Sequence, residues 1–190
     1  MHNVNYLDLK DLTLFYFKLK YNKSYATIEL EKQAKTILLQ MKAKADAHNL
    51  LYDQGLFSYT MGLWENSDIS LKDITRLRRP NTVFTGSELF RTFREPATEE
   101  QLKSIIDKKG RIPAVIDTAD NAFLSYKSGV YECQNTELNL QLNVLIIGYG
   151  TENNIDYWLC KNSWGTSFGE SGKFKIVRKN SPCGLKVFLL

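Results

Sequence analysis

The spacing of apolar residues changes near Pro80, and this change constrains the fold of the chain more than any other feature. Before it, residues 28–50 contain neither glycine nor proline. Their apolar side chains recur every three or four residues, at Ala34, Ile37, Leu38, Met41 and Ala45. This spacing predicts one long helix that packs along a single face. Arg79, which Pro80 biases toward an extended conformation, marks the end of the helical region.

A second stripe precedes the long helix, and it is rich in aromatic residues. It consists of Leu12, Phe15, Tyr16 and Leu19. The same spacing predicts a helix that packs through these four side chains.

The region after Pro80 combines one helix with short extended segments. Thr98 to Gln101 form a capping-box sequence and Gly110 supplies a stop, so we predict a helix over residues 99–109. Short apolar or alternating runs predict strands at Ile112–Ile116, Val144–Ile147, Tyr157–Cys160 and Lys173–Val177.

Composition and charge exclude several classes of protein. The 190 residues suffice for one ordinary domain or two small ones. The net charge is +4 and lysine and arginine form no dense cluster, so we expect no nucleic-acid partner. No apolar run reaches the ~18–20 residues of a membrane helix, and the first residues lack the pattern of a secretory signal. With no Cys-x-x-Cys and no His-x-x-x-His pair, we predict neither a metal site nor a cofactor.

Three segments of the second half resemble a known family. They are Phe123–Tyr131, Val144–Gly150 and Tyr157–Gly172, the last reading Tyr-Trp-Leu-Cys-Lys-Asn-Ser-Trp-Gly-Thr-Ser-Phe-Gly-Glu-Ser-Gly. Together they resemble the right-hand, β-barrel domain of papain-like cysteine proteases of the cathepsin L type. The resemblance runs from about Thr98 to the C-terminus.

The first 80 residues resemble the inhibitory propeptide of the same family. Asn49 matches the last position of the interrupted Glu-Arg-Phe-Asn-Ile-Asn helix motif. Gly62 and Asp68 match the two ends of the Gly-x-Asn-x-Phe-x-Asp motif that follows. The remaining positions of the helix motif hold other residues, namely Leu30, Ala34, Leu38, Met41 and Ala45.

The resemblance implies an α+β fold in three parts. Residues 1–80 would form a helical, propeptide-like domain, residues 81–97 a junction, and residues 98–190 the right-hand part of a peptidase domain. The Cys-Gly-Ser-Cys-Trp string that begins the family's left-hand domain occurs nowhere in the sequence. We therefore expect the left-hand domain, with its catalytic cysteine, to be missing.

The resemblance also locates the other two positions of the catalytic triad. Counting back from Gly148-Tyr149-Gly150 puts Leu142 where the family has its histidine. Asn162 matches the asparagine that orients that histidine. Because the family's nucleophile is a thiolate activated by histidine, we predict that the chain is catalytically inactive.

The cysteines and histidines that are present offer no replacement. Cys133 and Cys183 match a family pair that bridges the right-hand domain, so the resemblance implies one disulfide. Cys160 lies within a predicted strand and is interpreted as a small buried apolar residue. His2 and His48 are interpreted as surface or hydrogen-bonded histidines.

Three functions stay open. The chain could be an inert or regulatory pseudo-protease. It could be an inhibitor in which residues 1–80 block a cathepsin L-type protease. It could be the truncated or spliced product of a gene for a lysosomal cysteine endopeptidase. The family is lysosomal or extracellular and its disulfide suits an oxidising compartment, but no signal peptide is predicted, so we assign no compartment.

Two structural consequences are expected from the family. Its propeptide docks on the right-hand domain, so we expect Phe15, Phe17 and Trp64 to pack against Tyr126–Tyr131. The barrel face that normally meets the left-hand domain would lack its cover and would favour self-association. The side chains expected to be uncovered are those of Val144–Ile147, Trp158 and Trp164.

Overall fold

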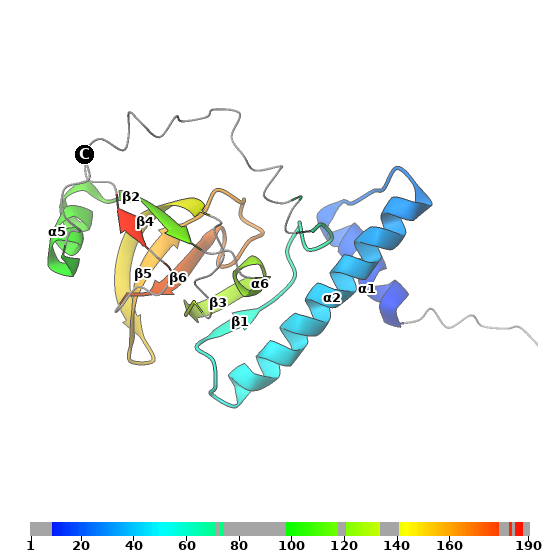
Figure 1. Cartoon of the computed structure of the whole chain (residues 1–190), viewed down its shortest axis with the longest axis horizontal. Coiled ribbons are helices and arrows are strands. Elements are labelled where there is room, and N and C mark those ends of the chain that lie inside the picture. Colours follow the sequence, from blue (N-terminus) through cyan, green and yellow to red (C-terminus); the bar gives the residue numbers. More distant parts are fainter. Residues whose placement is uncertain are drawn as a thin grey trace, which may run out of the picture.

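A computed structural model describes residues 9–70, 73, 98–117, 121–133, 141–178, 183 and 185–187. Helices and strands are both well represented, and two long N-terminal helices lie beside a curved sheet (Figure 1), so the α+β prediction is confirmed. The helices are α1 (Leu9–Tyr21), α2 (Ile28–Asp53), α5 (Glu99–Lys109) and α6 (Asn121–Leu124). The strands are β1 (Tyr59–Met61), β2 (Ile112–Asp117), β3 (Tyr126–Tyr131), β4 (Gln141–Glu152), β5 (Ile155–Lys161), β6 (Lys173–Val177) and β7 (Lys186–Val187).

The sheet joins strands from both halves of the chain. Its order is β1-β3-β6-β5-β4-β2-β7. Only β3 and β6 pair in parallel, and the other neighbours are antiparallel. The four predicted strands are all present, and the run at Val144–Ile147 is the middle of the much longer β4. The proposed junction at residues 81–97 and His2 lie outside the described residues.

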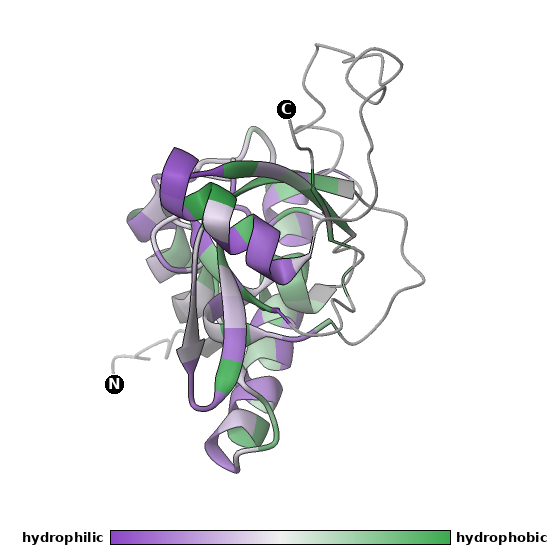
Figure 2. Ribbon diagram, turned by 90° about the vertical axis from the view of Figure 1, so that its left-hand side faces the viewer, coloured by the Kyte–Doolittle hydropathy of each residue, from purple (hydrophilic) through white to green (hydrophobic). Residues whose placement is uncertain are grey.

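Helix α5 has the boundaries that its capping signals predict. The Thr98 side chain accepts a hydrogen bond from Gln101 N–H, and the Gln101 side chain accepts one from Thr98 N–H. Gly110 ends the helix in the left-handed conformation, at φ 77°. Hydrophobic and hydrophilic residues alternate around this helix (Figure 2), and Leu102 and Ile106 face the core.

Helix α2 is also as predicted. The Thr27 hydroxyl caps its N-terminus by accepting from Leu30 N–H. Its buried side chains are members of the predicted stripe, Ala34, Leu38, Met41 and Ala45. Four of the positions where the family motif has other residues therefore form an apolar packing face.

The predicted packing face of α1 is wrong. The side chains of this helix that the structure describes exclude Leu12; among them, Leu14 and Phe17 are buried and pack with Leu38 of α2. Three members of the predicted stripe are largely exposed: Phe15 by 55%, Tyr16 by 64% and Leu19 by 65%. Apolar residues surround α1 on several sides, so their spacing alone does not decide which side meets α2.

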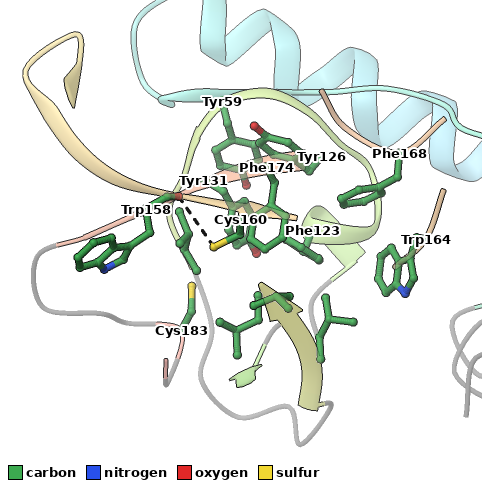
Figure 3. Close-up of a cluster of buried hydrophobic side chains, with 14 of the residues drawn as sticks. Tyr59, Phe123, Tyr126, Tyr131, Trp158, Cys160, Trp164, Phe168, Phe174 and Cys183 are labelled. Carbon is green, nitrogen blue, oxygen red and sulfur yellow. Dashed lines mark hydrogen bonds between the residues drawn. The ribbon is translucent and has the colours of Figure 1, made fainter. Parts of the chain in front are cut away.

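The barrel core is dominated by aromatic rings, which Figure 3 shows gathered around Phe123. The Phe123 ring lies 4.9–5.8 Å from its neighbours Tyr131, Trp164, Phe168 and Phe174, measured between centroids. The expectation of an uncovered barrel face is wrong for four of its six side chains, whereas Leu145 and Ile147 are half-buried. The side chains of Val144, Ile146, Trp158 and Trp164 are buried, with 5% exposure or less.

A disulfide joins Cys133 and Cys183, whose Cα atoms are 5.4 Å apart, so the predicted pair is confirmed. It connects the end of β3 to the segment that precedes β7. Among the described residues, no helix has the length and apolar character needed to cross a membrane.

Candidate functional site

Asn162 directly follows β5, and hydrogen bonds hold both its backbone and its side chain. Its N–H donates to Gly172 O at 2.9 Å, and its Oδ1 accepts from Ser163 N–H at 2.7 Å. The residue is 6% exposed, and its Nδ2 has no hydrogen-bond partner in the described part of the chain. The amide oxygen, which would orient a histidine in the family, is thus used by the backbone of its own loop.

Leu142 lies near the start of β4, opposite Ile116 of β2. It is 8% exposed and belongs to the same core cluster as Val144 and Ile146. An aliphatic side chain carries no proton that it can exchange, so this position cannot supply a general base.

A pair of stacked tryptophans covers the loop that contains Asn162. The rings of Trp64 and Trp164 are nearly parallel, at 6°, with centroids 5.5 Å apart. Trp64 comes from the N-terminal region and Trp164 from the loop after β5, and both are buried. Phe168 meets both rings edge-on. The N-terminal region therefore contributes directly to the burial of the Asn162 loop.

Cys160 is the cysteine outside the disulfide, and it is fully buried in β5. Its Sγ lies 4.0 Å from Trp158 O (Figure 3). Burial raises the pKa of this thiol well above its ordinary value. Since the thiolate is the nucleophilic form of cysteine, Cys160 is an inert core residue, as the sequence indicated.

His48 lies on α2, and none of its described contacts is with a cysteine. Its Nε2 lies 2.9 Å from Tyr59 O, to which it donates a hydrogen bond. Its ring stacks on Phe57 at 4.2 Å and lies tilted against Tyr59 at 4.4 Å, measured between centroids. His48 is thus a hydrogen-bonded structural residue. No group of His, Cys, Asp and Glu that could hold a metal ion occurs in the described ranges.

Strand β1 attaches the N-terminal region to the barrel. It pairs antiparallel with β3, with Tyr59 opposite Gly129 and Met61 opposite Tyr126. The approach is so close that a Cβ atom at Gly129 would lie 2.4 Å from Ser58 O, and Gly129 also has φ 90°. Tyr59 is 1% exposed and enters the aromatic core beside Tyr131.

Asn49 and Gly62 hold β1 in place. The Asn49 side chain makes two hydrogen bonds to Met61, donating from Nδ2 to O at 2.9 Å and accepting at Oδ1 from N at 2.8 Å. Gly62 N–H donates to Ser125 O at 2.7 Å. These two residues connect α2 and the barrel through β1.

Asp68 makes a third connection, within the N-terminal region. It is 3% exposed. Its carboxylate accepts from Tyr25 Oη at 2.9 Å and pairs with Lys23 Nζ at 3.2 Å. Burial and this carboxylate raise the pKa of Tyr25. Asp68 therefore ties the α1–α2 connection to the segment after β1.

The side chains expected at the barrel contact are only partly right. Phe15 is exposed, and Phe17 packs between α1 and α2. Trp64 does pack on the barrel, but against Trp164 and Phe168. The main contact with Tyr126–Tyr131 is β1, which sequence reasoning missed. Its only local signal is the alternation Tyr-Thr-Met, which is too short to identify a strand.

The comparisons with known proteins agree with this architecture. Residues 75–189 match the papain family of cysteine proteases. The chain belongs to this family. A structure of digestive procathepsin L 3 from Tenebrio molitor larval midgut superposes with a TM-score of 0.75 at 18% identity, covering 96% of this chain and 100% of that one. That likeness supports the fold of a papain-like proenzyme.

Sequence relatives match a shorter stretch. A viral cathepsin of Epiphyas postvittana nucleopolyhedrovirus is 47% identical over 89 residues, which is 46% of this chain and 26% of the relative. Cathepsin S of Mus musculus is 42% identical over 88 residues, again 46% of this chain and 26% of the relative. These matches thus cover about a quarter of the length of the curated relatives.

Proposed function

We propose that this chain is a degenerate papain-family homologue that does not hydrolyse peptides by itself. The observation that carries the proposal is Leu142, an aliphatic core residue at the position where the resemblance expects the catalytic histidine. The cysteines add support, because Cys133 and Cys183 are bonded to each other and Cys160 is buried. Asn162, at the third triad position, has its amide oxygen engaged by Ser163.

The test is an assay of the purified full chain with a fluorogenic dipeptide substrate. We expect no substrate turnover that is sensitive to a thiol-directed inhibitor. Leu142→His is expected to stay inactive as well, because no described thiol is accessible to a histidine placed there. Turnover that is abolished both by the inhibitor and by Cys160→Ala would overturn the proposal.

A second candidate function is inhibition of a cathepsin L-type protease by residues 1–80. The observation that favours it is β1, which shows that the N-terminal region can add a strand to a papain-like barrel. The retained Asn49 and Asp68 hold that region together. Inhibition is expected to be weak, because four motif positions of α2 carry apolar residues that pack internally.

The test measures how strongly the full chain, and residues 1–80 alone, inhibit a cathepsin L-type protease. We expect an inhibition constant in the micromolar range or above, roughly 8 kcal/mol of binding free energy or less. Asn49→Ala should weaken whatever inhibition is found. A low-nanomolar constant would mean that the replaced motif positions matter little for binding.

A further inference from the structure

A pocket of about 630 Å³ lies between the C-terminal end of α2 and the hairpin that joins β4 and β5. In Figure 1 both of these ends point toward the bottom of the view, with β1 and β3 between them. This volume falls in the range of ligand pockets, which is about 300–1,000 Å³. The pocket is separate from Asn162 and Leu142, neither of which lines it.

The lining of the pocket is acidic. Three carboxylates contribute, Asp53 from the end of α2, Glu132 directly after β3 and Glu152 from the end of β4, and none of the described residues that line it is a lysine or arginine. Lys175 stands behind Glu152 and pairs with it at 2.6 Å, which offsets one of the three charges. Glu132 Oε1 lies 3.1 Å from Ser58 Oγ, whose proton has a nearer acceptor in Val130 O at 2.6 Å. The pocket thus carries a net negative charge.

The end of α2 adds to this potential. A long helix carries partial negative charge at its C-terminus, which cations normally offset. Helix α2 has 26 residues and no basic residue in its last turn. The partial charge at the C-terminal end of α2 is negative, like the charge of the three carboxylates, and does not depend on them.

The pocket also has apolar walls. Leu56 lines it and is 65% exposed, and Tyr52, Phe57 and Ile155 line it as well. The carboxylates are spread around these walls, and no metal-holding group of acids occurs in the described residues. An extended ligand that presents both a cation and an aliphatic side chain therefore fits the lining better than a single metal ion does.

We propose that this pocket binds a basic peptide segment of a partner protein, in which lysine or arginine lies beside an aliphatic residue. The basic side chain lies among Asp53, Glu132 and the end of α2, and the aliphatic side chain packs on Leu56. Because the walls come from both halves of the chain, the site exists only while β1 is paired with β3.

The test measures binding of a fluorescent Leu-Arg-Lys-Leu peptide to the full chain by anisotropy, beside a Leu-Gln-Gln-Leu peptide. We expect saturable binding of the basic peptide, at least about tenfold tighter than that of the neutral one, and weaker in high salt. Asp53→Asn combined with Glu132→Gln should lower the affinity about tenfold. Leu56→Ser should lower it as well.

Matched controls lie outside the pocket. Leu50→Ser removes a leucine that is 63% exposed at the same end of α2, and Glu100→Gln removes an exposed carboxylate on α5; both should leave binding unchanged. Circular dichroism of each variant verifies folding. Equal binding of the two peptides, equal affinity in pocket and control variants, or saturable Ca²⁺ binding without peptide binding would each overturn the proposal.

Discussion

At the residue scale, the buried hydroxyl of Tyr126 is a good example of how the barrel positions polar groups. Its Oη donates to Gly129 O at 2.8 Å, lies 3.1 Å from Glu170 Oε1 and accepts from Lys175 N–H at 3.3 Å. Burial, and then the charge of Glu170, raise the pKa of Tyr126 far above its ordinary value of 10.0. The phenol therefore stays protonated in the folded chain at pH values where an unfolded chain would lose the proton.

This shift predicts a loss of stability in alkali. A group whose pKa is higher in the folded state contributes its full stabilisation of the fold at pH values below its pKa in the unfolded state. That contribution is lost as the pH rises through the pKa of the folded state. We therefore expect the free energy of unfolding to fall above pH 10, by up to about 1.4 kcal/mol per pH unit from this residue. Urea unfolding between pH 8 and 11 measures it. Tyr126→Phe should flatten the decline, whereas Tyr16→Phe, at an exposed position, should not; an equal decline in both would refute the assignment.

At the scale of elements, β1 depends on α2 as much as on the sheet. Two hydrogen bonds between the Asn49 side chain and Met61 engage both backbone groups of Met61, and β1 pairs with β3 along its length. His48, one residue earlier, donates to Tyr59 O. Successive residues of one helix thus hold both ends of a three-residue strand.

Removing the Asn49 side chain should destabilise the contact between the two halves of the chain. Asn49→Ala leaves both polar groups of Met61 without their partner, which costs about 1–3 kcal/mol when such groups are buried. We expect a loss of that size in urea unfolding, together with faster hydrogen exchange at β1. Gln40→Ala, at an exposed position of the same helix, is the control. A loss below 0.5 kcal/mol, which is roughly the range of a neutral surface substitution, would mean that β3 alone holds β1.

At the scale of the whole molecule, the disulfide connects two strands that lie far apart in the order of the shared sheet. The Cys133–Cys183 bond closes a loop with a sequence separation of 50 residues. The strands nearest to it are β3, which carries β1, and β7, which pairs with β2 at the other end of the sheet. The bond therefore links the strand next to one end of the order, β3, to the strand at the other end, β7.

Loss of this bond should lower the stability of the chain substantially. Closing a loop of this length contributes roughly 4 kcal/mol in the chain-entropy account. We expect Cys133→Ser combined with Cys183→Ser to unfold at a markedly lower urea concentration than the oxidised wild type. Non-reducing peptide mapping should find Cys133 linked to Cys183 and Cys160 unmodified by alkylating reagents in the native state. A mapped bridge that contains Cys160 would contradict the described barrel.

The sequence alone determined much of the local structure and the family. Helix α5 follows from Thr98, Gln101 and Gly110, because capping and termination involve neighbouring residues. The buried face of α2 follows from its regular apolar stripe, because Ala34, Leu38, Met41 and Ala45 recur every three or four residues. The disulfide followed from resemblance to the family, which a specific string of residues around Asn162 carries.

Only the tertiary structure decided how the two halves meet. The face of α1 that is buried depends on where α2 lies, and several sides of α1 are apolar enough to serve. Strand β1 depends on pairing of Tyr59 with Gly129, far away in the sequence, and the acidic pocket depends on the same contact. Local spacing carries no information about such pairs, because their free energy comes from hydrogen bonds and packing that exist only once the chain has brought distant segments together.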